Sequence, residues 1–144
     1  MDAGELCTRK TVIISEDKSV KTAAMLMKQY NVGSLVVVRP LNNHNIPVGI
    51  ITDRDIILNV IADNKELESI KVHRIMSAPV ITVQESTTLY EALMKMRYSG
   101  IRRVPVINEK GLLTGILSVD DILDNISKEL NEITQIFKKE EPAV

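Results

Sequence analysis

The chain has 144 residues, of which 44% are hydrophobic and 26% are charged, and its formal net charge is −1. This length and composition suit one compact domain, or two small ones that share a core, and exclude a disordered chain. No apolar run approaches the roughly 20 residues needed to span a bilayer, and residues 1–5 lack the basic start of a secretory signal. We therefore expect a cytoplasmic protein.

Charge and side-chain chemistry exclude further classes. Residues 1–69 hold 8 Lys and Arg against 9 Asp and Glu, and residues 70–144 hold 10 against 10, so neither half predicts nucleic-acid binding. The lone Cys7 cannot form an internal disulfide, and His44 and His73 lack metal-ligand spacing. No catalytic triad or phosphate-loop motif occurs. We therefore predict a non-catalytic protein without a metal site.

Internal similarity organises the chain. Residues 11–38 match residues 80–107 at an offset of 69, and residues 49–56 match 115–122 at an offset of 66. In each copy the hydrophobic pattern predicts strand, helix, strand, hairpin, strand, helix. The offset falls because the first copy has three extra residues within 39–47, and residues 108–111 are expected to turn more tightly.

The two copies define the expected domain organisation. We assign residues 1–64 to the first repeat, 65–76 to a linker, 77–137 to the second repeat and 138–144 to a flexible tail. A repeat of about 60 residues is marginally stable alone, so we expect the two to fold against each other.

Each copy carries a hydroxyl residue followed three positions later by aspartate, as Thr52 with Asp55 and as Ser118 with Asp121. Each pair lies between a predicted strand and a predicted helix. The spacing is typical of a capping box, which satisfies free backbone N–H groups. A carboxylate at a helix start can also accept ribose hydroxyls, with phosphate beside the free N–H groups. Both interpretations remain open for the same residues.

The segments 49–56 and 115–122, together with 72–77 and 101–107, resemble the signature of CBS domains, named after cystathionine beta-synthase. The resemblance covers residues 7–128, in order and in duplicate. It implies an α+β fold of two tandem βαββα repeats whose sheets pack about a pseudo-twofold axis, called a Bateman module. It also implies an adenosine ligand between the repeats, such as AMP, ADP, ATP or S-adenosylmethionine, and no catalytic cofactor.

Carried over by residue, the resemblance implies two clefts. Asp121 in the first and Asp55 in the second would hold the ribose, and apolar side chains would enclose the adenine. The first cleft would contain Val12, Val32, Gly33, Ser34, Arg102, Arg103, Ser118, Asp120 and Asp121. The second would contain Thr52, Arg54, Asp55, Ser77, Ile81 and Ile101.

The family's phosphate-facing basic positions fall on Arg102 and Arg103 in the second repeat but on Gly33 and Ser34 in the first. We therefore expect unequal clefts, with a nucleotide preferring the one that contains Asp121. Guanidinium groups attract phosphate and repel a sulfonium, so phosphorylated adenosine should bind more tightly than S-adenosylmethionine.

The leading hypothesis is a regulatory module that senses an adenine nucleotide and signals to an unknown protein partner in trans. We also expect a homodimer, formed through a helical stripe of Ala24, Met25 and Met94 with Tyr90 or Tyr98 nearby. One alternative is an interaction scaffold with vestigial clefts, and another is S-adenosylmethionine binding. Nucleic-acid binding is the weakest alternative.

Overall fold

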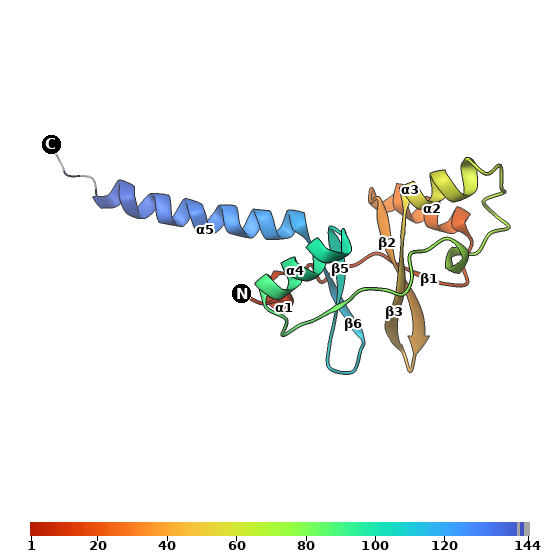
Figure 1. Ribbon diagram of the computed structural model, residues 1–144, viewed down its shortest axis with the longest axis horizontal. Coiled ribbons are helices and arrows are strands. Elements are labelled where there is room, and N and C mark those ends of the chain that lie inside the picture. Colours follow the sequence, from red (N-terminus) through yellow and green to blue (C-terminus); the bar gives the residue numbers. More distant parts are fainter. Residues whose placement is uncertain (141, 143–144) are drawn as a thin grey trace.

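The computed structural model describes residues 1–140 and residue 142. It contains two sheets of three strands, each covered by helices on its outer side, and the sheets lie next to each other in the middle of the molecule (Figure 1). Contacts between β3 (His44–Thr52) and β6 (Leu113–Ser118) join the two sheets. The expected α+β class and the pair of βαββα repeats are confirmed.

The first repeat forms the sheet β1-β2-β3, in which β1 is parallel to β2 and β2 is antiparallel to β3. A parallel pair needs a crossover connection, which α2 supplies between β1 and β2. The elements besides β3 are β1 (Ile13–Ser15), α2 (Val20–Tyr30), β2 (Ser34–Leu41), α3 (Asp53–Ile56) and the wider helical turn η1 (Ile57–Ile61).

The second repeat has the same order and strand directions. Its elements besides β6 are β4 (Val83–Gln84), α4 (Leu89–Ser99), β5 (Arg103–Ile107) and α5 (Val119–Glu140). Residues Thr88 and Glu91 form a capping box at the start of α4, and Gly100 ends the helix in the left-handed conformation at φ 65°. The strand-helix-strand pattern predicted for both copies is thus present in both.

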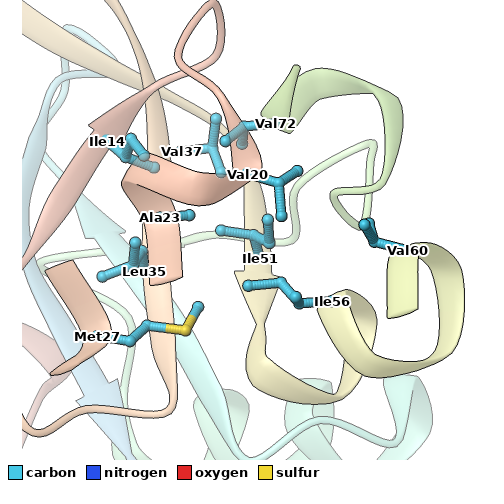
Figure 2. Packing of buried hydrophobic residues seen from close by; sticks show 10 residues of the cluster. All are labelled: Ile14, Val20, Ala23, Met27, Leu35, Val37, Ile51, Ile56, Val60 and Val72. Atoms are coloured by element: carbon cyan, nitrogen blue, oxygen red, sulfur yellow. The ribbon is translucent and has the colours of Figure 1, made fainter. Parts of the chain in front are cut away.

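The crossover helices bury one stripe against their sheets. In α2 the buried side chains are Val20, Ala23 and Met27, a spacing of three and four residues that places them on one helical face. Figure 2 shows this face directed at the sheet. The first core also contains Ile14, Leu35, Val37, Ile51, Ile56, Val60 and Val72.

Each repeat is completed by the segment that precedes the other repeat. The short helix α1 (Ala3–Leu6) buries Ala3 and Leu6 in the core of the second repeat. The short helix η2 (Val72–Arg74) buries Val72 in the core of the first. Residues 1–9 therefore pack with the second repeat, although the division by sequence placed them in the first, and the expected linker packs onto the first repeat.

Glycines in β3 and β6 make room for these crossing segments. A Cβ on Gly49 would lie 2.9 Å from the Ser77 carbonyl oxygen, and one on Gly115 would lie 2.9 Å from the Thr8 carbonyl oxygen. Real side chains do not approach that closely. Glycine is required at both positions because backbone passes directly over the strand.

The hairpins differ from the expectation. In the first repeat the ladder between β2 and β3 continues to Leu41 and His44, so the turn is only Asn42–Asn43. Both asparagines have positive φ, 49° and 65°, which a two-residue hairpin of this kind requires and asparagine tolerates. The second repeat turns through residues 108–112. The prediction of a tighter turn in the second copy is therefore wrong, because the three extra residues lengthen the strands.

Helix α5 continues to Glu140 and projects away from the second repeat (Figure 1). The expected flexible tail began at residue 138, yet residues 138–140 are helical, and the remainder of that prediction falls on residue 142 and on residues outside the described part. Across the described chain, no helix combines the length and the apolar character needed to cross a membrane.

Candidate functional site

Ser118 and Asp121 form a local hydrogen-bonded unit where β6 passes into α5. The Ser118 Oγ accepts a hydrogen bond from the Asp121 backbone N–H at 3.1 Å. The same hydroxyl donates to Asp121 Oδ2 at 2.7 Å. Ser118 is buried, with 8% of its surface exposed, while Asp121 is half-buried. The serine therefore caps the helix, as the spacing predicted, and the aspartate carboxylate stays at the surface.

A residue that the sequence analysis missed completes this unit. Thr8 Oγ1 donates to Asp121 Oδ2 at 3.4 Å, across 113 positions of sequence. The Thr8 backbone is held against β6 by two bonds with Ile116, of 2.9 and 3.0 Å. The signal was available: at the offset of 69, Thr8 corresponds to Ser77, which was predicted to lie in the other cleft.

A second missed hydroxyl lies on the same segment. Thr11 Oγ1 is buried and has no hydrogen-bond partner among the described residues. Thr11 stands between Thr8, which pairs with the second repeat, and Val12, whose carbonyl accepts from Val36 in the first. The segment 8–12 therefore bridges the two repeats and carries polar groups at the junction.

The two predicted arginines lie beside the start of α5. The Arg102 carbonyl accepts from the Val119 N–H at 2.9 Å, which fixes the start of β5 next to the helix. Arg103 Nη1 donates to Ser34 Oγ at 3.1 Å, so the predicted residues of the two repeats do meet. Arg102 and Arg103 also approach Asp120, at 3.8 and 4.0 Å.

The apolar residues predicted for the first cleft border the first core. Val12 and Val32 are half-buried and pack against that core. The Gly33 carbonyl accepts from the Asp53 N–H at 3.0 Å, and a Cβ on Gly33 would approach the Asp53 carboxylate to 3.1 Å. Ser34, which follows Gly33, accepts a hydrogen bond from Arg103 and so connects this region to the neighbours of Asp121.

The second predicted site has the same framework with different hydrogen bonding. Thr52 Oγ1 accepts from the Asp55 N–H at 3.1 Å, and Asp55 Oδ2 accepts from the Thr52 N–H at 2.9 Å. Ser77 exchanges backbone bonds with Ile50, of 2.8 and 3.2 Å, as Thr8 does with Ile116. Ile81 and Ile101 are half-buried against the second core, and Arg54 is exposed.

The two aspartates therefore bind different partners. Asp55 accepts a backbone N–H and closes a complete capping box. Asp121 instead accepts the hydroxyl groups of Ser118 and Thr8. A carboxylate that accepts hydroxyl donors has the chemistry needed for the hydroxyl pair of a ribose. This difference distinguishes the sites more sharply than their motifs, which are alike.

Groups next to Thr8 on the same segment have shifted pKa values. Burial raises the pKa of the Cys7 thiol, which disfavours the reactive thiolate. Arg9 donates to the Glu85 carboxylate at 2.6 Å, and this hydrogen bond raises the pKa of Arg9 and lowers that of Glu85. These contacts fasten the segment to the second repeat.

Two cavities of the described structure lie away from the predicted sites. One of about 450 Å³ is located at the hairpin end of the sheets, and none of the residues predicted for the two clefts lines it. Its lining residues are His44, Gln84, Glu85, Ser86, Asn108, Glu109, Lys110 and Leu112. Among the described residues, no three His, Cys, Asp or Glu side chains gather closely enough to hold a metal ion.

The structure is thus a tandem pair of βαββα repeats, each with a hydroxyl–aspartate unit after its third strand. The family model described as "CBS domain" matches residues 3–62 and 72–128. The chain belongs to the CBS domain family, and it contains two such domains in tandem.

Curated relatives cover most of this chain. It is 36% identical over 123 residues to the uncharacterized protein MK0525 of Methanopyrus kandleri, a match of 85% of this chain and 61% of that protein. It is 36% identical over 121 residues to the mitochondrial CBS domain-containing protein CBSX3 of Arabidopsis thaliana, a match of 83% of this chain and 58% of that protein. The chain thus spans about three fifths of the length of these two relatives.

Solved structures share the fold, and two of them contain adenosine derivatives. The CBS domain protein PAE2072 from Pyrobaculum aerophilum, complexed with AMP, is 30% identical with a TM-score of 0.74, covering 84% of this chain and 89% of that one. The CBS domain pair of MJ0100, in complex with 5-methylthioadenosine and S-adenosyl-L-methionine, is 25% identical with a TM-score of 0.75, covering 90% and 98%. The hexameric CBS-CP12 protein from bloom-forming cyanobacteria is 32% identical with a TM-score of 0.72, covering 85% and 69%.

Proposed function

We propose that this protein is a non-catalytic regulatory module that binds an adenine nucleotide at Asp121 and passes the bound state to a protein partner in trans. The observation that carries the proposal is the Asp121 carboxylate, which accepts two hydroxyl groups and follows Asp120, the residue that Arg102 and Arg103 approach. The ribose hydroxyls replace those of Thr8 and Ser118 or join them, and the phosphate faces Arg102 and Arg103. The AMP complex of PAE2072 supports the choice of ligand class.

The position of Asp121 favours a sensing role. It lies in the first turn of α5, which continues for 22 residues to Glu140. Its partner Thr8 lies on the segment that joins the cores of both repeats. A ligand held between Thr8 and Asp121 therefore changes the free energy of docking this segment against α5. A ligand that binds one arrangement of the repeats more tightly than another shifts the equilibrium toward that arrangement.

The ligand test uses calorimetry with AMP, ADP, ATP, adenosine and S-adenosylmethionine on the unmodified protein. We expect the nucleotides to bind more tightly than adenosine or S-adenosylmethionine. Replacing Asp121→Asn should weaken nucleotide binding by about tenfold or more, because a hydrogen bond to a charged group contributes roughly 1.5–3 kcal/mol. The matched variant Asp55→Asn should have a smaller effect on affinity, since Asp55 already serves the backbone of Thr52.

Thermal unfolding of the ligand-free variants is the control, because each substitution removes a negative charge from the first turn of a helix and lowers stability by about 0.3–1 kcal/mol without touching a ligand. Equal losses of affinity in the two variants would contradict the assignment to Asp121. Tighter binding of S-adenosylmethionine than of AMP would show that the arginines do not face the ligand. The absence of binding by every ligand would favour the scaffold hypothesis.

We also propose that the protein acts as a homo-oligomer, at least a dimer. Apolar side chains on the outer helices support this, because Met25 is 60% exposed, Tyr90 71% and Tyr98 73%. The CBS-CP12 relative is a hexamer. The protein partner and the cytoplasmic location remain predictions from the sequence.

A further inference from the structure

The two arginines beside Asp121 share a carboxylate of the protein itself. Asp120 Oδ1 lies 3.8 Å from Arg102 Nη2, and Asp120 Oδ2 lies 4.0 Å from Arg103 Nη2. The Asp120 side chain is 66% exposed. The Asp120 carboxylate therefore lies within ion-pairing distance of both guanidinium groups, to which a phosphate would also be attracted.

The fold does not require an acid at this position. At the offset of 66, Asp120 corresponds to Arg54, which occupies the same place in the equivalent turn of the first repeat. The capping at the start of α5 comes from Ser118 with Asp121, and Asp120 takes no part in it. The charge of Asp120 is thus free to act on its neighbours.

The charges at equivalent positions also differ between the two repeats. The second repeat has two arginines and one extra acid, whereas the equivalent positions of the first repeat hold Gly33, Ser34 and the basic Arg54. The extra acid leaves the arginine pair with a reduced attraction for anions. This reduction grows with the number of negative charges on the ligand.

We propose that Asp120 is an internal counter-anion that sets how many phosphate charges the Asp121 site accepts. This inference rests on the proposed function. In the ligand-free protein the carboxylate screens Arg102 and Arg103. A bound phosphate pairs with the guanidinium groups in place of Asp120. The Asp120 carboxylate then lies close to the phosphate and repels it, because both are negative. The repulsion is smallest for the single phosphate of AMP and largest for ATP, so Asp120 directs the preference toward AMP.

The test compares Asp120→Asn with Asp124→Asn by calorimetry with adenosine, AMP and ATP. Asp124 is the matched control, because it lies one turn further along α5 and pairs with Lys128 at 2.7 Å. Asp120→Asn should tighten AMP binding by about threefold to fivefold and ATP binding by more. Adenosine binding should not change, and the gains should shrink at high salt. Asp124→Asn should leave all three affinities unchanged.

The outcomes separate this inference from the proposed function. If the unmodified protein binds AMP but Asp120→Asn binds AMP and ATP no more tightly, the inference is wrong and the proposed function stands. Weaker AMP binding by Asp120→Asn would show that Asp120 contacts the ligand directly, which also overturns it. An equal gain for adenosine would reveal a structural effect instead of a charge effect. If neither the unmodified protein nor any variant binds a nucleotide, the proposed function itself is wrong.

Discussion

At the scale of single residues, Glu85 and Arg9 illustrate how one ion pair serves the crossing segment. Arg9 Nη1 donates to the Glu85 carboxylate at 2.6 Å and Arg9 Nη2 donates to the Gly4 carbonyl at 2.9 Å. Glu85 corresponds to Glu16 at the offset of 69, and Glu16 pairs with Arg39 of its own repeat. The second repeat therefore takes its arginine from the segment that crosses to it.

This pair predicts a dependence of stability on pH. The hydrogen bond from Arg9 lowers the pKa of Glu85 below its usual value of 4.5. A carboxylate whose pKa is lower in the folded state contributes stability above the pKa of the unfolded chain, and loses it as the pH falls through the folded value. Glu85→Gln should therefore have a lower urea midpoint than the unmodified protein at pH 7.

The difference in urea midpoint should shrink as the pH falls below about 4 and the Glu85 carboxylate is protonated. Glu109→Gln, in the exposed 108–112 turn, controls for loss of a carboxylate. A difference that stays constant from pH 7 to acid would contradict the assigned cause.

Sequence spacing identified Ser118, Asp121, Thr52 and Asp55, because a capping box is local and its geometry follows from a separation of three residues. It missed Thr8, whose bond to Asp121 depends on how distant segments pack. It also gave both aspartates the same role. The difference between a carboxylate bound to a backbone N–H and one bound to hydroxyls exists only in three dimensions.

At the scale of elements, the contact between each crossing segment and its strand predicts the cost of filling a glycine. Gly49→Ala and Gly115→Ala should each lower the free energy of unfolding toward the upper end of about 1–3 kcal/mol, since the added methyl group meets backbone that cannot move aside. Chemical denaturation measures both. Gly111→Ala is the comparison, because nothing lies within 4 Å and only its φ of 77° opposes the change, at roughly 1 kcal/mol.

If Gly49→Ala or Gly115→Ala is as stable as the unmodified protein, the crossing segments do not press on β3 and β6 in solution.

The order and type of elements were predictable because the hydrophobic period changes from helix to strand at the same places in both copies. The hairpin was not, since three extra residues lengthen a loop or a pair of strands equally well until the Asn42–Asn43 turn is recognised.

At the scale of the molecule, exposed apolar surface predicts self-association. Met25 on α2 and Tyr98 on α4 lie on outer helices, and a second apolar surface occurs on the projecting part of α5. That α5 surface consists of Leu130, Ile133, Ile136 and Phe137, each at least half exposed. Sedimentation velocity at roughly tens of micromolar should show a species larger than the 16.1 kDa monomer.

Charged variants locate the interface. Met25→Glu should return the protein to the monomer if the outer helices pair, while Ile133→Glu tests the α5 surface in the same way. Lys28→Glu, which changes charge on α2 without removing an apolar side chain, is the control. A 16.1 kDa monomer for the unmodified protein at that concentration would contradict self-association.

Residues 1–9 pack with the second repeat and η2 packs with the first, and this arrangement sets the order in which native contacts can form during synthesis. Residues 1–9 emerge from the ribosome before either sheet, yet the strand that holds Thr8 is β6, whose Ile116 is translated more than a hundred residues later. The first repeat likewise waits for Val72 before its core closes. The earliest residues of this module are thus among the last to reach their native contacts. Ala3 and Leu6 can reach their native buried positions only after nearly the whole second repeat has been made.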